Sequence, residues 1–588
     1  MAAYKVGPYA SSSQSASFLA SLPIAAKRAL VGVGLISAAI NLLALTGSLF
    51  MLQVYDRVLP SSSLPTLVAL SILTVALFAF YGLLDFLRRR VLVGFGTWLD
   101  ASLGARAYDA VVQLPLTHIQ GGEKLNPVRD LDAVRAFLSS PALGVLFDLP
   151  WTPLYIGLIY LFHPLLALLA FGGMIILVAV MIATEVRSRD ATSAANAAAI
   201  ERQRALEVSR RNAATLRALG MAKNYMAVWD GANERYLSSQ QRVNDIGGGY
   251  GALARTLRMI LQSAVLGVGA YLVIKQEASA GVMIAASIIT GRALAPLDSA
   301  IPNWNSWLAA RQSWARLSKL LKSLANSPET LPLRQPMSEV RVERVQVAPP
   351  GSNRAVLQDV SFKLERSQGL GIIGPSAAGK SSLAHILVGA WAPVMGKVRL
   401  DGAALDQWQP EELGKHIGYL PQSVELFPGT IAQNIARFEP NPDSDAIICA
   451  AEAAGVHELI VNLPEGYQTT IGQDAPGLSA GQMQRIALAR ALYRDPFLVV
   501  LDEPNSNLDA DGEAALTRAI LGVRQRGGIA IVVAHRPTAL AGVDTLLVLG
   551  QGRVRAFGPK DEILTELARP PGQKPPLKVV PDPMEAVS

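Results

Sequence analysis

The chain has 588 residues, of which 51% are hydrophobic and only 17% are charged. That composition excludes an ordinary soluble enzyme, in which about a quarter of the residues are charged, and membrane segments are the natural explanation. The net charge of +7 comes without a basic patch interleaved with aromatic residues, so we expect no nucleic-acid partner. The single cysteine, Cys449, excludes an internal disulfide and a zinc site built on several thiolates. We expect it to lie unreactive on an apolar helix face.

The N-terminal half of the sequence contains six apolar runs. Residues 1–28 form a Ser/Ala-rich segment that ends in Lys27 and Arg28. The first apolar run is far longer than the apolar core of a signal peptide, so we expect a membrane-spanning helix instead of a removed leader. The six predicted spans are 29–54, 64–87, 143–161, 164–184, 257–274 and 278–297.

Positive charge orients these spans. Lys and Arg residues fall before the first span, between the second and third, between the fourth and fifth, and after the sixth. Because cytoplasmic loops of membrane proteins carry an excess of Lys and Arg, we expect the N-terminus, the two long loops and everything after the sixth span in the cytoplasm. The stretch 201–217 has helical charge pairs and no helix breaker, which predicts that the membrane helices continue into these loops. The predicted membrane domain covers 29–322.

Three ionisable residues, Asp85, Asp148 and Arg292, lie in or near the predicted spans. Ionisable groups within a bilayer face a cavity or a partner, whereas groups at a helix end can reach water along their side chains. The second interpretation is favoured for Asp85 and Arg292. For Asp148, which has prolines nearby, both interpretations stay open.

A linker at 323–338 leads to a predicted α/β domain at 339–568, and the Pro-rich tail at 569–588 is expected to be disordered. Within the domain, the apolar run 369–373 is followed by the pattern G-x-x-x-x-G-K-S and then by a helical pattern. A loop that leaves a buried strand and opens a helix turns backbone N–H groups toward phosphate oxygens. The predicted phosphate-binding residues are Gly374, Pro375, Ser376, Ala377, Ala378, Gly379, Lys380, Ser381 and Ser382.

Lys380 of this loop is expected to reach the β- and γ-phosphates, and Ser381 to ligate Mg²⁺. A second apolar run, 497–501, ends in two carboxylates. Asp502 is expected to hold the Mg²⁺ shell from the end of a buried strand, with Glu503 next to the attacking water. A lone glycine-rich loop is often only a turn, but a matching acidic strand makes the pair of motifs specific. The sequence therefore predicts that the chain binds and hydrolyses ATP.

Residues 478–482 read Leu-Ser-Ala-Gly-Gln and run into a helical pattern. Here the chain resembles the ATP-binding cassette (ABC) superfamily, whose signature reads Leu-Ser-Gly-Gly-Gln, with Ala480 as a mild departure. The resemblance implies that Ser479, Gly481 and Gln482 contact an ATP held by the opposite subunit. One chain has one phosphate loop and one signature, so the family's arrangement implies a head-to-tail homodimer that encloses two ATP molecules.

The same resemblance assigns roles to three further positions. Gln422 matches the Q-loop glutamine that senses Mg²⁺ and couples to the membrane domain, Asp509 matches the D-loop aspartate, and His535 matches the switch histidine that contacts the γ-phosphate. The expected catalytic residues are then Glu503, His535 and Gln422, and the expected Mg²⁺ ligands are Ser381, Gln422 and Asp502.

Two stretches depart from the family pattern. Residues 347–351 read VAPPG and hold no aromatic side chain to stack on adenine, so the adenine contact stays unassigned. The acidic residue that usually precedes the signature corresponds here to Gln473 or Asp474.

The whole arrangement resembles an ABC exporter: a membrane α-helical bundle of six spans followed by an α/β P-loop nucleotide-binding domain. Residues 52–60 (LQVYDRVLP), 147–153 (FDLPWTP) and 291–296 (GRALAP) resemble the bacterial type I secretion ATPases, in the protease/lipase branch without an N-terminal peptidase-like domain. The resemblance implies ATP-driven export of unfolded proteins with a C-terminal secretion signal from the bacterial inner membrane, surrounded by membrane lipid. It also implies a periplasmic adaptor (membrane fusion protein) and an outer-membrane channel as partners.

Two other functions share the ATP motifs. An exporter or flippase of lipids or small amphiphilic molecules would need no adaptor, and amphiphiles should stimulate its ATPase. A soluble ATPase of the same superfamily, such as a DNA-repair or translation factor, is contradicted by the six spans.

Overall fold

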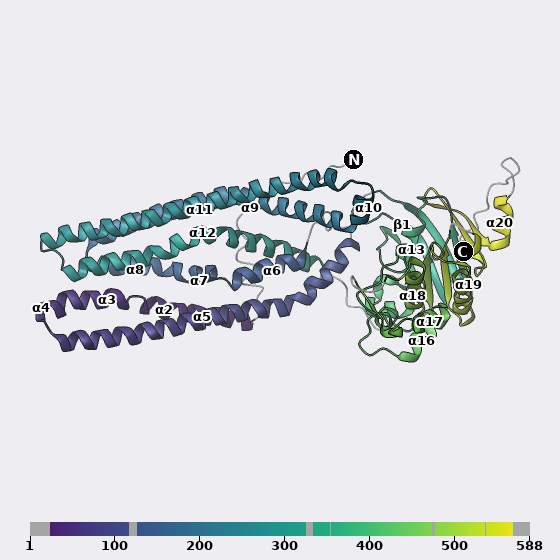
Figure 1. Ribbon diagram of the computed structural model, residues 1–588, viewed down its shortest axis with the longest axis horizontal. Helices are drawn as coiled ribbons and strands as arrows, with labels where there is room; N and C mark the ends of the chain where they lie inside the picture. Colours follow the sequence, from purple (N-terminus) through teal and green to yellow (C-terminus); the bar gives the residue numbers. More distant parts are fainter. Residues whose placement is uncertain are drawn as a thin grey trace, which may run out of the picture. The chain divides into compact units, whose positions relative to one another are not determined.

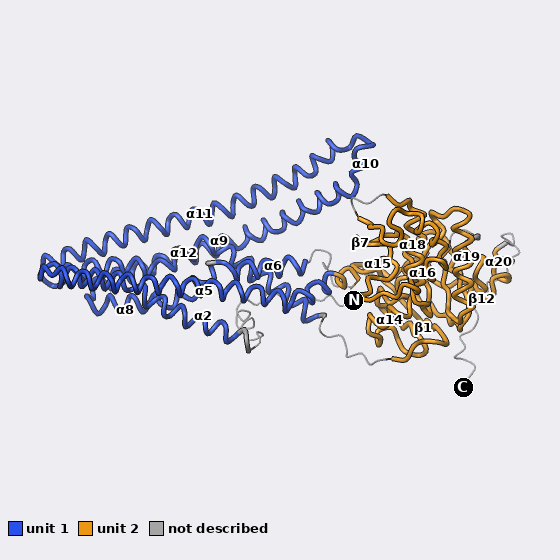
Figure 2. Tube along the Cα trace, turned by 60° about the horizontal axis from the view of Figure 1, so that its bottom comes forward, with its two compact units in different colours: residues 1–111, 126–325 blue, residues 112–125, 326–588 orange. Residues whose placement is uncertain are grey.

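The structure is a computed structural model that describes residues 24–116, 126–324, 333–352, 354–472, 477–534 and 537–568. The chain divides into two compact units, residues 1–111 with 126–325 and residues 112–125 with 326–588, which Figure 2 colours separately. The first unit is built from helices, and the second contains the β-sheets with helices around them (Figure 1). The predictions for residues 1–23, Gln473, Asp474, His535 and the tail 569–588 lie outside the described residues.

Among the described residues of the first unit, six helical segments are long and apolar enough to cross a membrane, which confirms the predicted number of spans. They are Lys27–Ser61, Leu64–Leu116, Ala142–Phe162, Pro164–Arg211, Ala222–Ile274 and Ala280–Ser323. The helices of this unit are α2 (Ile24–Leu43), α3 (Thr46–Gln53), α4 (Leu59–Ser61), α5 (Leu64–Gln113), α6 (Pro127–Leu138), α7 (Pro141–Asp148), α8 (Thr152–Phe162), α9 (Pro164–Arg211), α10 (Ala213–Ala218), α11 (Ala222–Ile274) and α12 (Ala280–Leu324).

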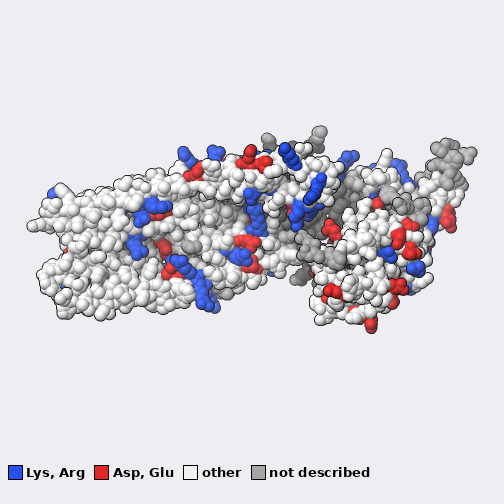
Figure 3. Space-filling view, in the orientation of Figure 1, with Lys and Arg blue, Asp and Glu red and all other residues white. Residues whose placement is uncertain are grey.

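Four of these helices are much longer than a bilayer is thick. With 50, 48, 53 and 45 residues, α5, α9, α11 and α12 are roughly 68–80 Å long at 1.5 Å per residue, against a hydrocarbon core of about 30 Å. These helices run well beyond the predicted spans, but α9 ends at Arg211, inside the stretch 201–217 for which the sequence indicated no break. On the face shown in Figure 3, charged side chains are sparse around the α4–α5 and α11–α12 turns and gather toward the α10 end.

The first and third spans are irregular. In the first, a π-helical turn, Val54–Val58, carries the helix past the end expected at residue 54 and on to Ser61. In the third, the 3₁₀ turn Leu149–Trp151 separates α7 from α8. Pro150 and Pro153 lie at these helix starts, where a missing backbone N–H costs little.

Asp85 and Asp148 both have a partner, Arg88. The Arg88 guanidinium lies 2.8 Å from Asp85 and 3.0 Å from Asp148, and Asn41 donates to Asp148 at 2.8 Å. The favoured interpretation of Asp85 as a group that simply reaches water is therefore wrong, and Asp148 also faces partners. Arg292 is exposed within α12, and its favoured interpretation stays a prediction.

The second unit contains a six-stranded sheet of order β12-β11-β3-β10-β9-β6, parallel except for the edge strand β12. A four-stranded antiparallel sheet has the order β2-β1-β4-β5, and β7 pairs with β8. The strands are β1 (Glu339–Val347), β2 (Leu357–Glu365), β3 (Gly369–Ile373), β4 (Met395–Leu400), β5 (Ala403–Ala404), β6 (Ile417–Leu420), β7 (Gly429–Thr430), β8 (Thr470–Ile471), β9 (Leu498–Asp502), β10 (Ile529–Val533), β11 (Thr545–Gly550) and β12 (Arg553–Pro559).

The central strands are buried on both faces. Every residue of β9 and β10 is buried, because helices cover the sheet on one face while α13 and the antiparallel sheet cover the other. The helices of this unit are α13 (Lys380–Leu387), α14 (Pro410–His416), α15 (Ile431–Ile435), α16 (Ser444–Ala453), α17 (His457–Val461), α18 (Ala480–Leu492), α19 (Ala510–Gln525) and α20 (Lys560–Ala568).

The register of the parallel strands aligns their carboxyl ends. Asp502 of β9 pairs with Val533 of β10, Val533 pairs with Ile372 of β3, and Leu420 of β6 pairs with Leu501. Residues that follow these strands therefore meet at one edge of the sheet, which is where open α/β sheets bind their ligands.

Cys449 is exposed on α16, whose packed face is formed by Ile447, Ala450 and Ala451. The expected position on the apolar face of a helix is therefore wrong.

Candidate ATP site

The phosphate loop leaves β3 and opens α13. Gly379 has φ +97°, and a Cβ atom there would lie 2.5 Å from the Leu357 side chain. A Cβ atom on Gly374 would lie 2.3 Å from the carbonyl oxygen of Leu549. Both positions therefore require glycine, and the resulting tight turn ends at the N-terminus of α13, where backbone N–H groups and the helix dipole favour an anion.

The Lys380 ammonium group lies across this loop. It donates to the carbonyl oxygens of Gly374 at 2.9 Å and Pro375 at 3.0 Å, and the residue is 6% exposed. Burial lowers the pKa of Lys380, while Glu503 and Asp502 act to raise it. The two carboxylates are thus within electrostatic reach of the ammonium group, and the phosphate loop and the acidic end of β9 belong to one site.

Asp502 offers a buried oxygen without a donor among the described residues. The residue is 1% exposed, and within that part of the chain its Oδ1 has no hydrogen-bond partner. Burial raises the pKa of Asp502, and a hydrogen bond with Ser381 lowers it. A cation would satisfy the orphaned oxygen, whose burial is otherwise costly.

A hydroxyl and a carboxylate in contact suit Mg²⁺. This ion usually takes one or two protein oxygens together with phosphate oxygens and water. In the described part of the chain, no cluster of three or more His, Cys, Asp and Glu side chains could hold a metal alone. Ser381 and Asp502 therefore fit a Mg²⁺ ion that arrives with a nucleotide.

Glu503 lies at the turn after β9. It has φ +50°, in the left-handed region that non-glycine residues rarely occupy. Its N–H donates to the carbonyl oxygen of Val533 at 3.0 Å, and its own carbonyl accepts from Ser506 at 3.3 Å. Backbone strain of this kind concentrates at functional sites, and here it keeps Glu503 beside the end of β10.

Gln422 and His535 follow β6 and β10, the two strands on either side of β9. Gln422 is exposed and comes two residues after the end of β6, so it lies near the same sheet edge as Asp502. The N–H of Ala534, the residue before His535, donates to the carbonyl oxygen of Ile372 at 3.1 Å. The chain is thus fixed against β3 up to the residue before the histidine.

Ser479 and Gln482 form a capping box at the start of α18. The Ser479 hydroxyl accepts from the Gln482 N–H at 3.2 Å, and the Gln482 side chain accepts from the Ser479 N–H at 2.8 Å. Gly481 is closely packed, because a Cβ atom there would lie 2.6 Å from the carbonyl oxygen of Asn507. The signature residues thus build a rigid, exposed helix start.

Gln484 ties this helix to the segment after Glu503. Its Nε2 donates to the carbonyl oxygen of Pro504, and its Oε1 accepts from the N–H of Asn507 at 3.2 Å. The sequence interpretation missed Gln484. The only signal for it in the sequence is a polar residue among the apolar residues of the helix α18. In the structure, Gln484 is 2% exposed.

Asp509 is held by two contacts within the chain. It lies 3.3 Å from the Arg485 guanidinium, and its Oδ1 accepts from the N–H of Gly512 at 2.9 Å as the N-cap of α19. The signature helix and the predicted D-loop are therefore one connected structure.

In the structure, one group contains the phosphate loop, Asp502 and Glu503. The signature residues form a separate group. Over the described ranges, no hydrogen bond or ion pair joins the loop 374–381 to Ser479, Gly481 or Gln482. The signature residues make their hydrogen bonds within α18.

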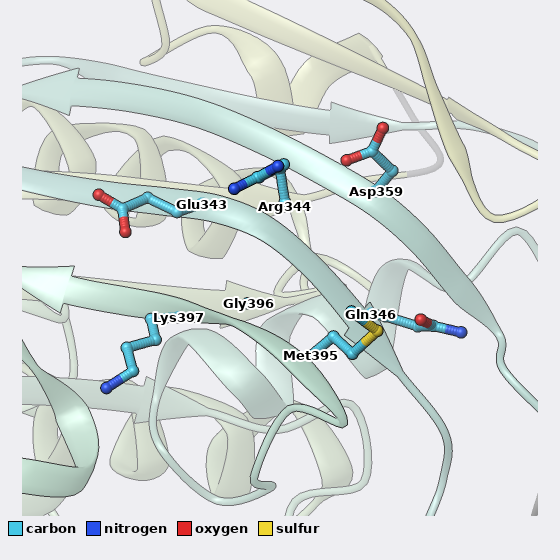
Figure 4. A pocket seen from close by; sticks show the side chains of 7 residues that line it. All are labelled: Glu343, Arg344, Gln346, Asp359, Met395, Gly396 and Lys397. Atoms are coloured by element: carbon cyan, nitrogen blue, oxygen red, sulfur yellow. The ribbon is translucent and has the colours of Figure 1, made fainter. Parts of the chain in front are cut away.

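A hollow of about 500 Å³ lies on the antiparallel sheet and contains none of the predicted nucleotide residues (Figure 4). It follows a bulge in β1, whose pairing with β4 shifts between Glu343 and Gln346. Glu343 is already paired with Arg399 at 3.0 Å. The hollow is lined by Glu343, Arg344, Gln346, Asp359, Met395, Gly396 and Lys397.

Comparisons with known proteins agree with this architecture. Two protein-family models match the chain. The family model for the ABC transporter transmembrane region matches residues 30–293, and the one for the ABC transporter matches residues 357–506. The Type I secretion system ATP-binding protein PrsD of Rhizobium meliloti (strain 1021) is 51% identical over 562 residues, which cover 95% of this chain and 97% of that protein.

More distant relatives have related names. The Toxin RTX-I translocation ATP-binding protein of Actinobacillus pleuropneumoniae is 28% identical over 90% of this chain and 76% of that protein. The Cyclolysin secretion/processing ATP-binding protein CyaB of Bordetella pertussis is 29% identical over 91% of this chain and 76% of that protein. The solved structure of a bacterial Atm1-family ABC exporter with ATP bound matches with a TM-score of 0.76 at 21% identity, covering 92% of this chain and 96% of the other. That match confirms the predicted exporter fold.

Proposed function

The chain belongs to the type I secretion ATP-binding proteins of the ABC transporter family, and from that premise we propose that it works as a homodimer in a bacterial inner membrane. It is a membrane ATPase of protein export. Its proposed cargo is an unfolded protein with a C-terminal secretion signal. The proposed partners are a periplasmic adaptor and an outer-membrane channel, and the nucleotide-binding domain is placed in the cytoplasm. The names of relatives that secrete or translocate proteins support this proposal.

The proposed dimer is supported by the division of the ATP site within one chain. Lys380, Asp502 and Glu503 lie within electrostatic reach of one another, whereas Ser479 makes its hydrogen bonds within its own helix. A second copy placed head to tail would bring its exposed Ser479 to the phosphate loop of the first. Each of two ATP molecules would then contact both copies.

In the proposed mechanism, the loop binds the β- and γ-phosphates. The Lys380 ammonium group exchanges the carbonyl oxygens of Gly374 and Pro375 for phosphate oxygens, which replaces two weak acceptors by charged ones. Glu503 accepts the proton of the water that attacks the γ-phosphorus in line, and His535 orients that water and the γ-phosphate.

Ser381 and Asp502 would hold Mg²⁺, with Gln422 as a third ligand, and the ion would neutralise charge on the phosphate oxygens. Asp502 would thereby gain a partner for its buried Oδ1. Closure around ATP and reopening after hydrolysis would move the attached helices between inward- and outward-facing states.

The test compares proteins secreted by cells that carry the wild-type chain or Glu503→Gln. The variant keeps the shape of the side chain but removes the general base, so we expect a few proteins to disappear from the medium and accumulate inside. Mass spectrometry of the medium measures this, and common C-termini of the lost proteins would define the secretion signal.

Glu452→Gln, at an exposed position on α16, is the matched control and should secrete normally. Both variants should be present in the membrane fraction at the wild-type level. If the set of secreted proteins is unchanged while lipid distribution or drug sensitivity is altered, protein secretion is wrong and the flippase hypothesis takes its place.

A further inference from the structure

Arg437 occupies an unusual backbone position just after α15. It has φ +56°, and the next residue, Phe438, has φ +58°. Two consecutive non-glycine residues in the left-handed region persist only where surrounding contacts determine the conformation. Here the Phe438 N–H donates to the carbonyl oxygen of Gln433 at 2.9 Å, and the Arg437 side chain supplies further contacts.

The Arg437 guanidinium donates to four backbone carbonyl oxygens. These belong to Arg490 at 3.0 Å, Ala491 at 3.2 Å, Gly414 at 2.5 Å and Ile417 at 3.2 Å. Burial lowers the pKa of Arg437 to about 10, so the group stays charged at neutral pH. It forms no ion pair among the residues that the structure describes. Its partners are thus peptide groups from three different elements.

Three of those carbonyls lie at helix ends, where they need a donor. Arg490 and Ala491 lie in the last turn of α18, Gly414 lies in the last turn of α14, and Ile417 begins β6. The last carbonyls of a helix have no partner within it and carry the negative end of its dipole. The planar guanidinium fork serves several acceptors in fixed directions, which a lysine ammonium cannot reproduce.

The signature helix and β6 also touch directly. A Cβ atom on Gly418 would lie only 2.1 Å from the carbonyl oxygen of Ala491, so the end of α18 packs on the strand backbone. Beyond the strand, Arg490 donates to the carbonyl oxygen of Glu425 from both terminal nitrogens at 3.2 Å. Contacts with the end of α18 therefore flank Gln422 on both sides.

We infer that Arg437 is a positioning residue that makes the Q-loop and the signature helix one rigid piece. A displacement of Gln422 at one ATP is then transmitted along α18 to Ser479, which faces the other ATP. The inference rests on the proposed function, because it takes the role of Ser479 in the opposite site from there. It adds a residue to the coupling that no sequence motif contains.

The test is steady-state hydrolysis by the purified full-length chain in lipid nanodiscs. Arg437→Lys keeps the charge but loses the fork, and we expect kcat to fall about tenfold. The KM for ATP and the affinity for a fluorescent ATP analogue should stay within about twofold of wild type, because the phosphate loop is untouched. A merely structural defect would lower binding and turnover together.

Arg524→Lys is the matched control. Arg524 also donates to two backbone carbonyls, of Ser367 and Gly542, and pairs with Asp544, but none of these belongs to the Q-loop or the signature helix. We expect a similar loss of thermal stability with unchanged kcat. If Arg437→Lys keeps the wild-type kcat, or loses nucleotide affinity in step with kcat, the inference is overturned.

Should Arg437→Lys fail to fold or to reach the membrane, Arg490→Lys tests the same connection through Glu425. A lower kcat at unchanged KM then supports the coupling, and an unchanged kcat overturns it. Ser479→Ala, made in the wild-type chain, separates a failure of the inference on Arg437 from a failure of the proposed function. If Ser479→Ala hydrolyses ATP normally, the proposed dimer site fails, whatever Arg437 does.

Discussion

The Thr152 hydroxyl donates a hydrogen bond to the carbonyl oxygen of Ala293 at 2.9 Å, across 141 residues of sequence. Thr152 begins α8 directly after the 3₁₀ turn of the third span, and Ala293 lies three residues before Pro296 inside α12. Pro296 has no N–H to donate to the carbonyl oxygen of Arg292, four residues earlier, so the helical ladder of α12 is interrupted in this turn. The bond therefore joins two of the stretches that resemble secretion ATPases at the point where both helices are irregular.

Thr152→Val should destabilise the membrane unit. The residue is 3% exposed, and the isosteric valine removes this hydrogen bond between two helices, at a cost of about 0.5–1.5 kcal/mol. Unfolding of the purified chain in mixed detergent micelles measures the loss.

Thr184→Val is the control, because the Thr184 hydroxyl donates only to Val180 in its own helix, at 2.8 Å, and the residue is fully buried. That variant should change stability by well under 1 kcal/mol, since the Val180 carbonyl keeps its helical partner. Equal losses in the two variants would show that the bond between helices is not special.

The Asp56 carboxylate caps the start of α12, and this predicts a coupled pair of variants. It accepts from the Gly281 N–H at 2.9 Å and from the Ser279 hydroxyl at 2.6 Å. A Cβ atom on Gly281 would lie 2.6 Å from the carboxylate, so Gly281→Ala must displace Asp56 and should cost about 1–3 kcal/mol.

Gly281→Ala should cost far less when Asp56→Ala has already removed the carboxylate. The double variant should therefore lose less stability than the sum of the two single losses. Unfolding of the four chains of this cycle measures the coupling. Gly267→Ala, with open space around the added methyl group, should be neutral or stabilising. Strictly additive losses for the Gly281 and Asp56 variants would contradict the capping contact.

The number of spans was predictable because apolar run length is a local property, but their ends were not. The charged residues at 55–57 and 88–90 indicate helix ends in the sequence. In the structure, Asp56 caps another helix and Arg88 pairs with Asp148, so both charges are satisfied while the helices continue. Such partners come from distant parts of the chain and leave no local signal.

The ATP site also contains residues that a sequence pattern indicates and residues that leave no such pattern. Residues 374–381, Asp502 and Glu503 could be predicted because the proposed chemistry requires fixed residue types at fixed spacing after buried strands. Arg437 and Gln484 were missed because their acceptors are backbone carbonyls of other elements, and any sequence can supply a carbonyl. The left-handed backbone of Glu503 was equally invisible, since it depends on the contact with Val533.

The buried carboxyl group of Asp502 should make the stability of the nucleotide-free chain depend on pH. Burial raises the pKa of Asp502 above its ordinary value of 3.8, against the opposing effect of Ser381. Between the two values the folded chain binds more protons than the unfolded chain, so its stability falls as pH rises through a window that begins near 3.8. Asp502→Ala removes this dependence. We therefore expect the variant to gain stability relative to wild type as pH increases from about 4 to 7.

Thermal unfolding of both chains without nucleotide, at matched ionic strength, gives the difference at each pH. Mg²⁺ with ATP should then stabilise wild type at pH 7 and leave the variant nearly unchanged, because a bound cation offsets the buried charge only where the carboxylate is present. A difference that is flat across the pH range would show that Asp502 titrates alike in the folded and unfolded chains. An equal stabilisation of both chains by Mg²⁺ with ATP would remove Asp502 from the proposed metal site.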